Sequence, residues 1–307
     1  MKRRLLFHRD FLYYTGGHGK VWNYFQHARA HPAWSPRVFL SPASIAAGNP
    51  WLAHPESIDA RWDPGTADAL LLGGTDWSMY PVDDPGRPVI NLVQHVRHAD
   101  AGSQLRSHLR RRAIRICVSR QVADAILATG ETNGPVRVIE AALDLPSREA
   151  SPTDGRRGIF IDAMKQPDTG AALHRLLRER GRDSVLSTTR MPRGEYLGRL
   201  GSAAVAVLLP HPREGFYLPA LEAMALGCAT IVPDSIGNRA YLEPGRNALV
   251  PQPDPEALLE AVLQLDDDAL AARLVESGRA TARRFDLAGE RRAFHAILDD
   301  LDALWRA

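Results

Sequence analysis

The pattern of apolar and polar positions along the chain predicts an alternation of strands and helices. Through the first 145 residues, short apolar runs end in polar turns and are separated by longer stretches with helical spacing. Alternation of this kind is typical of a parallel sheet in the α/β class. The predicted strands are RRLLFH (3–8), RVFLSP (37–42), ADALLLGG (67–74), PVINLVQHV (88–96), AIRICVS (113–119) and VRVIEAAL (136–143).

A second series of strands and helices follows a stretch without periodicity. Residues 144–158, DLPSREASPTDGRRG, are rich in Pro, Ser, Asp and Gly, and we place a domain boundary there. The strands predicted beyond it are GIFIDAM (158–164), DSVLSTT (183–189), AAVAVLLP (203–210), CATIVP (228–233) and NALVP (247–251). The sequence therefore predicts domains at 1–150 and 151–285, and an amphipathic C-terminal helix at 286–307 that packs across their junction.

The composition fits two folded domains of a cytoplasmic protein. The 307 residues are 45% hydrophobic and carry a formal charge of +2, so the overall charge does not favour nucleic acid as a partner. Cys117 and Cys228 each lie in an apolar run, which indicates reduced core residues. The N-terminus MKRRLLFHRD begins like a signal peptide, but His8, Arg9 and Asp10 interrupt it, and no run of 18 apolar residues follows.

An acidic residue falls on the apolar stripe of a predicted helix. Pro219 is suited to open this helix and Gly227 to close it. The positions at i, i+3, i+4 and i+7 are Leu218, Leu221, Glu222 and Ala225. A buried carboxylate is costly unless hydrogen-bond donors meet it. The hydroxyls of a ligand would be such donors; the alternative is a Glu222 at the helix edge, half in water or paired with a nearby Arg.

This helix belongs to a compact strand–loop–helix–strand unit at residues 203–233. The free amides at its N-terminus and the helix dipole make this end an anion site that suits a phosphate. Glu214 lies just before that end and Glu222 about one turn inside it, so the two carboxylates would flank a pyrophosphate at roughly 10 Å. One carboxylate would then take sugar hydroxyls and the other ribose hydroxyls.

The stretch EGFYLPALEAMALG (214–227) resembles a known signature. Its two glutamates, spaced E-x(7)-E, are similar to those of retaining nucleotide-sugar glycosyltransferases with the GT-B fold, family 4 type. The resemblance extends through SIGNRAYLEPGRNALVPQPDPEALLEAV (235–262) and VRVIEAALD (136–144). It implies two Rossmann-like, doubly wound parallel-sheet domains facing each other across a cleft, the first on the acceptor side and the second binding the nucleotide sugar.

The resemblance also implies roles for individual residues of the signature. Glu214 would contact the donor sugar as a catalytic residue, and Glu222 would contact the ribose. The other donor contacts would come from the start of the helix, at Gly215, Phe216, Tyr217 and Leu218. Tyr217 departs from the family, which usually has Gly there, and would reshape the sugar pocket.

The family has a basic pair after the first strand of the second domain, which neutralises the leaving diphosphate. In GIFIDAMKQPD (158–168) the usual Arg is absent, with Asp162 or Ala163 near its place, and Lys165 is the cation that remains. We expect Lys165 at the diphosphate as a catalytic residue; the alternative is an ordinary lysine of a surface loop. Arg213, in the signature loop, would supply the missing charge at the donor.

A glycine-rich loop, YTGGHGK (14–20), opens a predicted helix in the first domain. The loop does not fit a Walker A pattern, and Trp22 stands where a dinucleotide fingerprint has its third glycine. The family has a glycine pair near the donor diphosphate, so Gly16 and Gly17 are expected there. His18 either touches the acceptor or is a solvated loop residue.

His95 ends the predicted strand PVINLVQHV. The family often has a His beside the donor sugar at this place, which would make His95 a catalytic residue. The alternative is a structural histidine, and the neighbouring His98 leaves the choice open.

Two kinds of charged run remain. Five arginines from Arg106 to Arg115, in LRSHLRRRAIR, form either a solvated helix face, the preferred interpretation, or a surface that attracts an anionic acceptor or a membrane. The acidic runs at 266–268 and 299–300 lie far from predicted strand ends. We interpret them as solvated faces and expect no metal site.

The resemblance implies a hexosyltransferase that uses a nucleoside-diphosphate sugar with retention of configuration. We expect a small-molecule or lipid-linked acceptor, no cofactor and no metal, with the leaving phosphate taking the acceptor's proton. The alternatives are a GT-B epimerase or hydrolase acting on a nucleotide sugar, and a non-catalytic nucleotide-sugar-binding partner subunit. The sequence names neither the sugar, the base, the acceptor nor the oligomeric state.

Overall fold

The computed structural model divides the chain into two compact units. Unit 1 comprises residues 1–142 and 287–307, and unit 2 comprises residues 143–286. The structure describes all residues except 1, 82–83, 85, 146–155 and 307. The predicted boundary between residues 150 and 151 therefore lies outside the described residues, and the C-terminal segment belongs to unit 1.

Unit 1 is built on a parallel sheet of seven strands in the order β3-β2-β1-β4-β5-β6-β7. The six predicted strands are present, as β1 (Arg3–Arg9), β2 (Trp34–Leu40), β4 (Ala69–Gly73), β5 (Val89–Val93), β6 (Ile114–Cys117) and β7 (Val136–Val138). The sequence did not predict β3 (Ile58–Asp59), which pairs only with Val38 and Phe39 of β2. A strand of two residues has no periodicity to detect.

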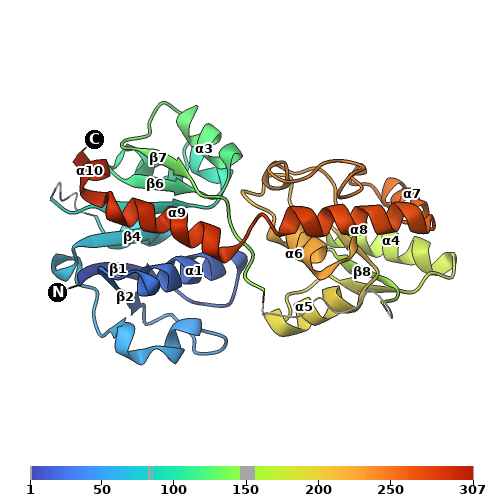
Figure 1. Cartoon of the computed structure of the whole chain (residues 1–307), viewed down its shortest axis with the longest axis horizontal. Coiled ribbons are helices and arrows are strands. Elements are labelled where there is room, and N and C mark those ends of the chain that lie inside the picture. Colours follow the sequence, from blue (N-terminus) through green and yellow to red (C-terminus); the bar gives the residue numbers. More distant parts are fainter. Residues whose placement is uncertain (1, 82–83, 85, 146–155, 307) are drawn as a thin grey trace. The chain divides into compact units, whose positions relative to one another are not determined.

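The helices of unit 1 join distant parts of the chain. They are α1 (Gly16–Ala30), α2 (Gln104–Ser107), α3 (Arg120–Leu127), α9 (Leu287–Asp299) and α10 (Leu301–Arg306). Helices α1 and α9 pack together, and Figure 1 shows both in front of the strands of this unit. Between them the Lys20 ammonium donates to Glu290 Oε1 at 2.7 Å and to the Ala142 carbonyl at 2.9 Å, and His27 Nε2 lies 2.8 Å from Glu290 Oε2. This buried network anchors the returning C-terminal segment in unit 1.

Unit 2 has a parallel sheet of four strands in the order β11-β10-β8-β9. The strands are β8 (Ile159–Asp162), β9 (Ser184–Ser187), β10 (Val205–Leu208) and β11 (Ala229–Ile231). The helices are α4 (Pro167–Glu179), α5 (Arg193–Ser202), α6 (Leu218–Leu226), α7 (Pro255–Gln264) and α8 (Asp268–Ala282). The predicted strand NALVP is wrong in part: Leu249 is joined to Ile231 by an isolated bridge, and Ala248 bridges back to Pro244 across the turn at 245–247.

Two apolar cores cover the two faces of the unit 2 sheet. Phe160, Ala206 and Leu208 pack in one core with residues of α6, whereas Ile159, Ile161 and Val207 pack in the other with residues of α4 and α7. Successive strand residues point to opposite faces, so strands buried on both sides read as continuous apolar runs. This is why GIFIDAM and AAVAVLLP could be recognised as strands.

Candidate functional site

The signature helix α6 has the predicted ends. Pro219 lies in its first turn, and Gly227 ends it with a φ of 83°, in the left-handed region that glycine adopts without strain. The predicted single stripe is wrong, because α6 packs against both α5 and α8 and is buried at every position from Ala220 to Met224. Glu222 is therefore more deeply buried than an amphipathic pattern predicts, at 4% exposure.

Lys165 and Glu214 form an ion pair at the carboxyl ends of two neighbouring strands. Lys165 lies in the loop after β8 and Glu214 in the loop after β10, and the adjacency of these strands joins residues 49 positions apart. The Lys165 side chain is 35% exposed and that of Glu214 is 13% exposed. Solvent, and hence a ligand, reaches this pair.

Glu222 is paired with an arginine, which was one of the alternatives that the sequence left open. Arg193, the first residue of α5, donates from Nη2 to Glu222 Oε1 at 2.6 Å. The Arg193 side chain is 29% exposed, so the pair is buried on the side of Glu222 only. A carboxylate accepts several hydrogen bonds, so a ligand hydroxyl could share Glu222 with Arg193. Sequence reasoning missed Arg193, which lies outside every recognised motif.

Asp162 is a third carboxylate at this edge of the sheet. It ends β8, where the Tyr196 hydroxyl donates to its Oδ2 at 3.1 Å and the Met164 amide to its Oδ1 at 3.4 Å. Burial raises the pKa of Asp162 against these hydrogen bonds. A polar residue at the end of an apolar strand was the signal that could have identified it.

Tyr217, where the family usually has Gly, turns its ring into the unit. The side chain is buried, and its pKa is held well above the ordinary value by burial and by the charges of Asp162 and Glu214. The Lys165 ammonium lies 5.4 Å from the centre of the Tyr217 ring, within range of a cation–π contact. The departure from Gly therefore fills space beneath Lys165 with a phenol.

Gly237 holds the signature loop in place. The Tyr217 amide donates to the Gly237 carbonyl at 3.1 Å, and the Ile236 amide donates to the Pro212 carbonyl at 3.0 Å. A Cβ on Gly237 would lie 2.7 Å from Glu214 Cβ and 2.9 Å from the Phe216 amide nitrogen. The close approach requires glycine and determines where Glu214 stands.

The other predicted donor-site residues differ in exposure. Arg213 is exposed, and Gly215 is buried. The half-buried Phe216 ring packs 5.6 Å from Tyr241 and 5.8 Å from Phe285, so its side chain is part of the core. Leu218 is half-buried at the start of α6.

Gly16 and Gly17 begin α1, at the carboxyl end of β1. Thr15 caps the helix by accepting from the His18 amide at 3.1 Å, and the Gly17 carbonyl accepts from Gln94 Nε2 at 3.2 Å. A Cβ on the loop's third glycine, Gly19, would meet the hydroxyl of Tyr14, so that side chain would have to shift.

The histidines predicted near the site in unit 1 differ in how deeply they are buried. His98 is buried, and burial lowers its pKa to about 4, which identifies it as a neutral structural histidine. His95 is half-buried, and its Nδ1 accepts from the Arg97 amide at 3.1 Å. His18 packs its ring 5.1 Å from that of Phe11. Of the pair at the end of β5, His95 is the one near the surface.

The arginine run is not one helix face, which corrects the preferred interpretation. It spans α2, a short 3-10 turn and β6. Arg115 is fully buried, where burial lowers its pKa to about 10, and its guanidinium donates to carbonyls that include those of Leu109 (2.7 Å) and Arg111 (2.6 Å). Arg106 and Arg110 both bond to Glu131. Most of the run therefore organises the chain before β6.

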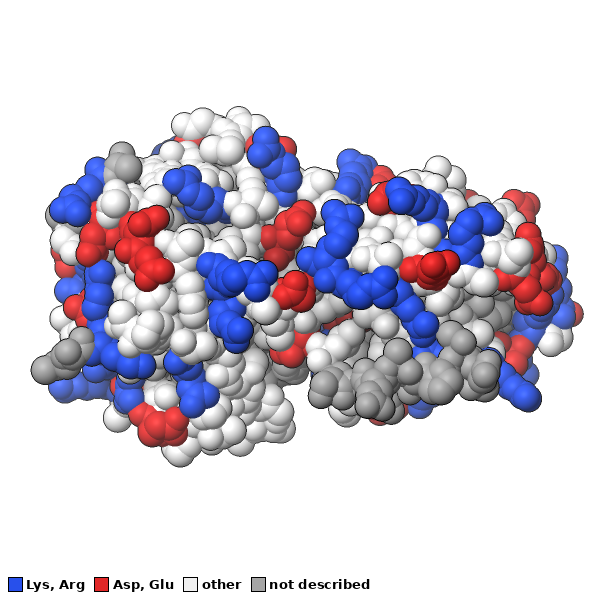
Figure 2. Space-filling view, viewed as in Figure 1, with Lys and Arg blue, Asp and Glu red and all other residues white. Residues whose placement is uncertain are grey.

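Charges of both signs are mixed over the face shown in Figure 2. Of the acidic runs, Asp266 pairs with Arg182, and Asp267 caps α8 by accepting from the Ala269 amide at 2.9 Å. Within the described ranges, no three His, Cys, Asp or Glu side chains are grouped to hold a metal. Across the same part of the chain, no helix combines the length and apolar content that a membrane span requires.

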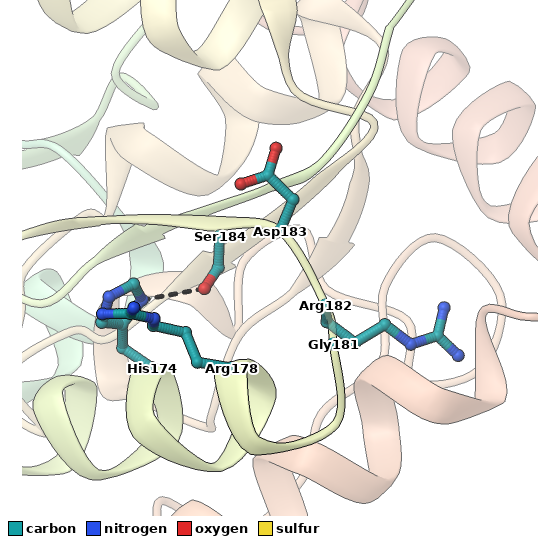
Figure 3. A pocket seen from close by; sticks show the side chains of 6 residues that line it. All are labelled: His174, Arg178, Gly181, Arg182, Asp183 and Ser184. Carbon is teal, nitrogen blue, oxygen red and sulfur yellow. Dashed lines mark hydrogen bonds between the residues drawn. The ribbon is translucent and has the colours of Figure 1, made fainter.

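A pocket of ≈ 430 Å³ lies at the other edge of the unit 2 sheet, where α4 ends and β9 begins. His174 Nδ1 lies 2.8 Å from Ser184 Oγ at one side, whereas Figure 3 shows Arg182 pointing the other way. The polar groups do not converge, and ligands of such sheets bind at the carboxyl ends of the strands. The Lys165–Glu214 and Arg193–Glu222 pairs therefore mark the better candidate site.

Comparison with known proteins bears on unit 2 most directly. Residues 155–268 match the family model described as glycosyl transferases group 1. No curated protein sequence matches the chain. The match contains Lys165, Arg193, Glu214 and Glu222, and it supports a glycosyltransferase.

Solved structures resemble the whole chain. Sucrose-phosphate synthase from Thermosynechococcus elongatus aligns with a TM-score of 0.68 at 16% identity, over 98% of this chain and 100% of that one. Anabaena HepE in complex with UDP-glucose aligns with a TM-score of 0.74 at 14% identity, over 97% and 99%. The lipopolysaccharide outer core galactosyltransferase WaaB aligns with a TM-score of 0.66 at 12% identity, over 97% and 99%. With its two parallel-sheet units, the chain has the GT-B fold.

Proposed function

We propose that the chain is a retaining glycosyltransferase that moves a hexosyl group from a nucleoside-diphosphate sugar to a small-molecule or lipid-linked acceptor, without a metal. One observation carries the proposal. The two glutamates of the signature, Glu214 in the loop after β10 and Glu222 in α6, each lie beside a cation, in the segment that matches the glycosyltransferase model.

Each part of the donor has a partner in this arrangement. The α6 N-terminus, with its free amides and dipole, takes the pyrophosphate together with Lys165. Glu222 Oε2 accepts from the ribose hydroxyls while Arg193 holds Oε1. Glu214 accepts from hydroxyls of the sugar. Anionic phosphates thus meet the cation and the helix end, and hydroxyls meet the carboxylates.

Donor binding exchanges partners at the Lys165–Glu214 pair. The diphosphate takes Lys165 and the sugar hydroxyls take Glu214, so the existing ion pair opens. Because both side chains are partly solvated, opening costs little, on the order of 1 kcal/mol or less. Glu214 is therefore a competitor for Lys165 until the sugar arrives.

Transfer proceeds on one face of the sugar. The bond from the anomeric carbon to the phosphate oxygen breaks, the bond to the acceptor oxygen forms, and the acceptor's proton passes to the leaving phosphate. The protein contributes by positioning the two substrates and by stabilising the charge that develops on the diphosphate. Lys165 and the α6 N-terminus perform in this scheme the charge neutralisation that a metal performs elsewhere.

HepE was solved with UDP-glucose, with UDP and glucose, and with UDP, so uridine donors are the first to test. The purified chain is incubated with UDP- and GDP-hexoses and a panel of glycosides and lipid-linked sugars, with EDTA present. The product's anomeric configuration, read by NMR, should match that of the donor. Inversion would exclude the retaining mechanism. Donor turnover without an acceptor would indicate an epimerase or hydrolase, and binding without turnover a partner subunit.

A further inference from the structure

The topological switch point of unit 1 lies between β1 and β4. The chain runs from β1 outward to β2 and β3, then returns to the other side of β1 and continues from β4 to β7. In open α/β sheets, ligands bind beyond the carboxyl ends of the strands at this point. Polar side chains at the ends of β1 and β4 are therefore placed to meet a ligand.

A buried cluster of His8, Arg9 and Asp76 occupies this position. His8 and Arg9 end β1, and Asp76 lies in the 3-10 helix η4 (Gly74–Met79) that follows β4. Asp76 Oδ1 lies 3.0 Å from His8 Nδ1 and 3.0 Å from Arg9 Nη2. Asp76 Oδ2 accepts from Arg9 Nη2 at 2.9 Å and from the Gly73 amide at 3.0 Å. Since a carboxylate only accepts, the hydrogen between the ring and Asp76 belongs to His8 Nδ1.

The other ring nitrogen of His8, Nε2, has no hydrogen-bond partner among the residues that the structure describes. His8 is 1% exposed, yet its Nε2 is buried without a hydrogen bond to any described residue, as are Arg9 Nε and Ser41 Oγ. Arg9 already balances the charge of Asp76, and a ring whose hydrogen is on Nδ1 presents a lone pair at Nε2. A buried polar group without a hydrogen bond is unfavourable. The cluster therefore needs a hydroxyl or a water to complete it.

A second buried histidine of unit 1 shows what a structural histidine looks like here. His31 precedes β2, at the amino edge of the same sheet, and is 3% exposed. Its Nε2 lies 3.0 Å from Asp299 Oδ1, and its Nδ1 accepts from the Ala33 amide at 3.1 Å. Both nitrogens of His31 are satisfied, whereas His8, at the ligand-binding edge, has one left over.

We propose that the carboxyl edge between β1 and β4 is a hydroxyl-binding subsite, in which His8 Nε2 accepts a hydrogen bond from a sugar or other polyol acceptor. The proposal rests on the proposed glycosyl transfer and names the acceptor's partner in unit 1. Arg9 Nε is a further buried donor without a hydrogen bond to a described residue, and the half-buried Trp62, whose ring lies 5.3 Å from that of His8, is an aromatic side chain suited to the apolar side of a sugar. Because His8 is 1% exposed, entry of the hydroxyl requires the side chains that cover it to move.

The first test observes His8 without turnover. The full chain, labelled with 15N in its histidines, is titrated with methyl glycosides of glucose, galactose, mannose and N-acetylglucosamine. His8 should be the Nδ1–H tautomer, and its Nε2 resonance should shift with at least one glycoside while the His31 resonances stay in place. An Nε2 resonance that none of the four moves would mean that a water completes the cluster, and would overturn the subsite.

The second test uses a substitution that keeps the fold. In His8→Asn the amide nitrogen takes the place of Nδ1 and still donates to Asp76, but nothing replaces Nε2. The acceptor kcat/KM should fall about tenfold, as expected for one hydrogen bond, with UDP affinity unchanged. His31→Asn is the matched control and should leave both unchanged. Equal acceptor kinetics in His8→Asn and the wild type would refute the role.

The two tests separate the subsite from the function on which it rests. A wild-type chain that transfers no sugar from any donor would refute the proposed transferase, while the glycoside titration still reports on His8. A chain that transfers sugar but shows neither the Nε2 shift nor the acceptor effect would refute the subsite alone.

Discussion

Two lysine–glutamate pairs, one in each unit, differ in what they can do. Lys165–Glu214 in unit 2 has side chains 35% and 13% exposed, whereas Lys20–Glu290 in unit 1 has side chains 4% and 1% exposed. Lys20 ends the glycine-rich loop 14–20, which fits neither a Walker A pattern nor a dinucleotide fingerprint, and Lys165 lies in the loop where the resemblance implies a cation at the diphosphate.

Burial and partners determine which of the two lysines can meet a ligand. Lys20 also donates to the Ala142 carbonyl, and Glu290 accepts from the Ala142 amide at 3.0 Å and bonds to His27, so both charges are fully engaged. An anion could take Lys20 only by removing the lysine counter-charge of Glu290 in the interior, at a cost of several kcal/mol. Lys165 is in contact with water, so it can exchange Glu214 for an anionic ligand. The buried pair is therefore structural, and the exposed one is suited to ligand exchange.

The largest expected effect is on the buried pair. Glu290→Ala should lower the free energy of unfolding by about 3–5 kcal/mol, because Lys20 is left buried and unpaired. Asp302→Ala, which breaks the exposed pair with Arg3, is the control and should cost about 1 kcal/mol or less. Urea denaturation followed by circular dichroism measures both. Equal losses would show that burial does not distinguish the pairs.

The same pair makes a prediction about pH. Burial acts to raise the pKa of Glu290, but Lys20 and His27 outweigh it, and the pKa is lowered overall. A carboxyl whose pKa is depressed by folding stabilises the protein above its unfolded pKa, about 4.3, and loses that contribution as the pH falls through the folded value. Below pH 4, the urea midpoint of unfolding should therefore decrease more steeply with falling pH in the wild type than in Glu290→Ala. Parallel pH curves would contradict this.

For the Lys165–Glu214 pair, the largest effect should be on turnover. Lys165→Ala should lower kcat about a hundredfold or more, because the charge on the leaving diphosphate loses its partner, while the unfolding midpoint stays nearly constant. Lys2→Ala removes another lysine, whose ammonium bonds only to the His31 carbonyl at 3.4 Å within the described residues, and serves as control. Turnover of Lys165→Ala within a factor of two of wild type would remove Lys165 from the site.

An intermediate effect is expected at Glu222. Glu222→Gln should weaken binding of UDP or GDP by about 1.5–3 kcal/mol, the scale of a hydrogen bond to a charged group, since the ribose belongs to the nucleotide. Calorimetry measures the loss, and Glu195→Gln, which alters a surface carboxylate of α5, is the control. Unchanged nucleotide affinity would make Glu222 only the structural partner of Arg193.

The smallest expected effect is on UDP affinity in Glu214→Gln, and its direction is the informative part. In Glu214→Gln, Lys165 no longer has a competing carboxylate, so UDP alone should bind about two- to fivefold more tightly, while the intact nucleotide sugar binds more weakly. Calorimetry with UDP and UDP-glucose, or with the donor that the transfer assay selects, tests both signs. Weaker binding of UDP in this variant would show that Glu214 does not compete for Lys165.

Much of the fold was predictable because the signals are local. Apolar runs located the main strands, and Pro219 and Gly227 marked the ends of α6. The failures share a cause: β3 and the segment around Leu249 pair over one or two residues, too few for periodicity to register. The prediction of a solvated helix face for the arginine run was wrong for another reason. The sequence does not distinguish a buried arginine that bonds to carbonyls from a solvated one.

The sequence by itself determined the α/β class, the signature helix and the two glutamates with their spacing. Only the tertiary structure decided which charges meet, because strand order and helix packing join Lys165 to Glu214 across 49 residues, His8 to Asp76 across 68 and Lys20 to Glu290 across 270. It also decided how much water each pair retains. A motif specifies residue types along the chain, whereas the strength and exchangeability of an ion pair depend on the partners and the solvent around it in space.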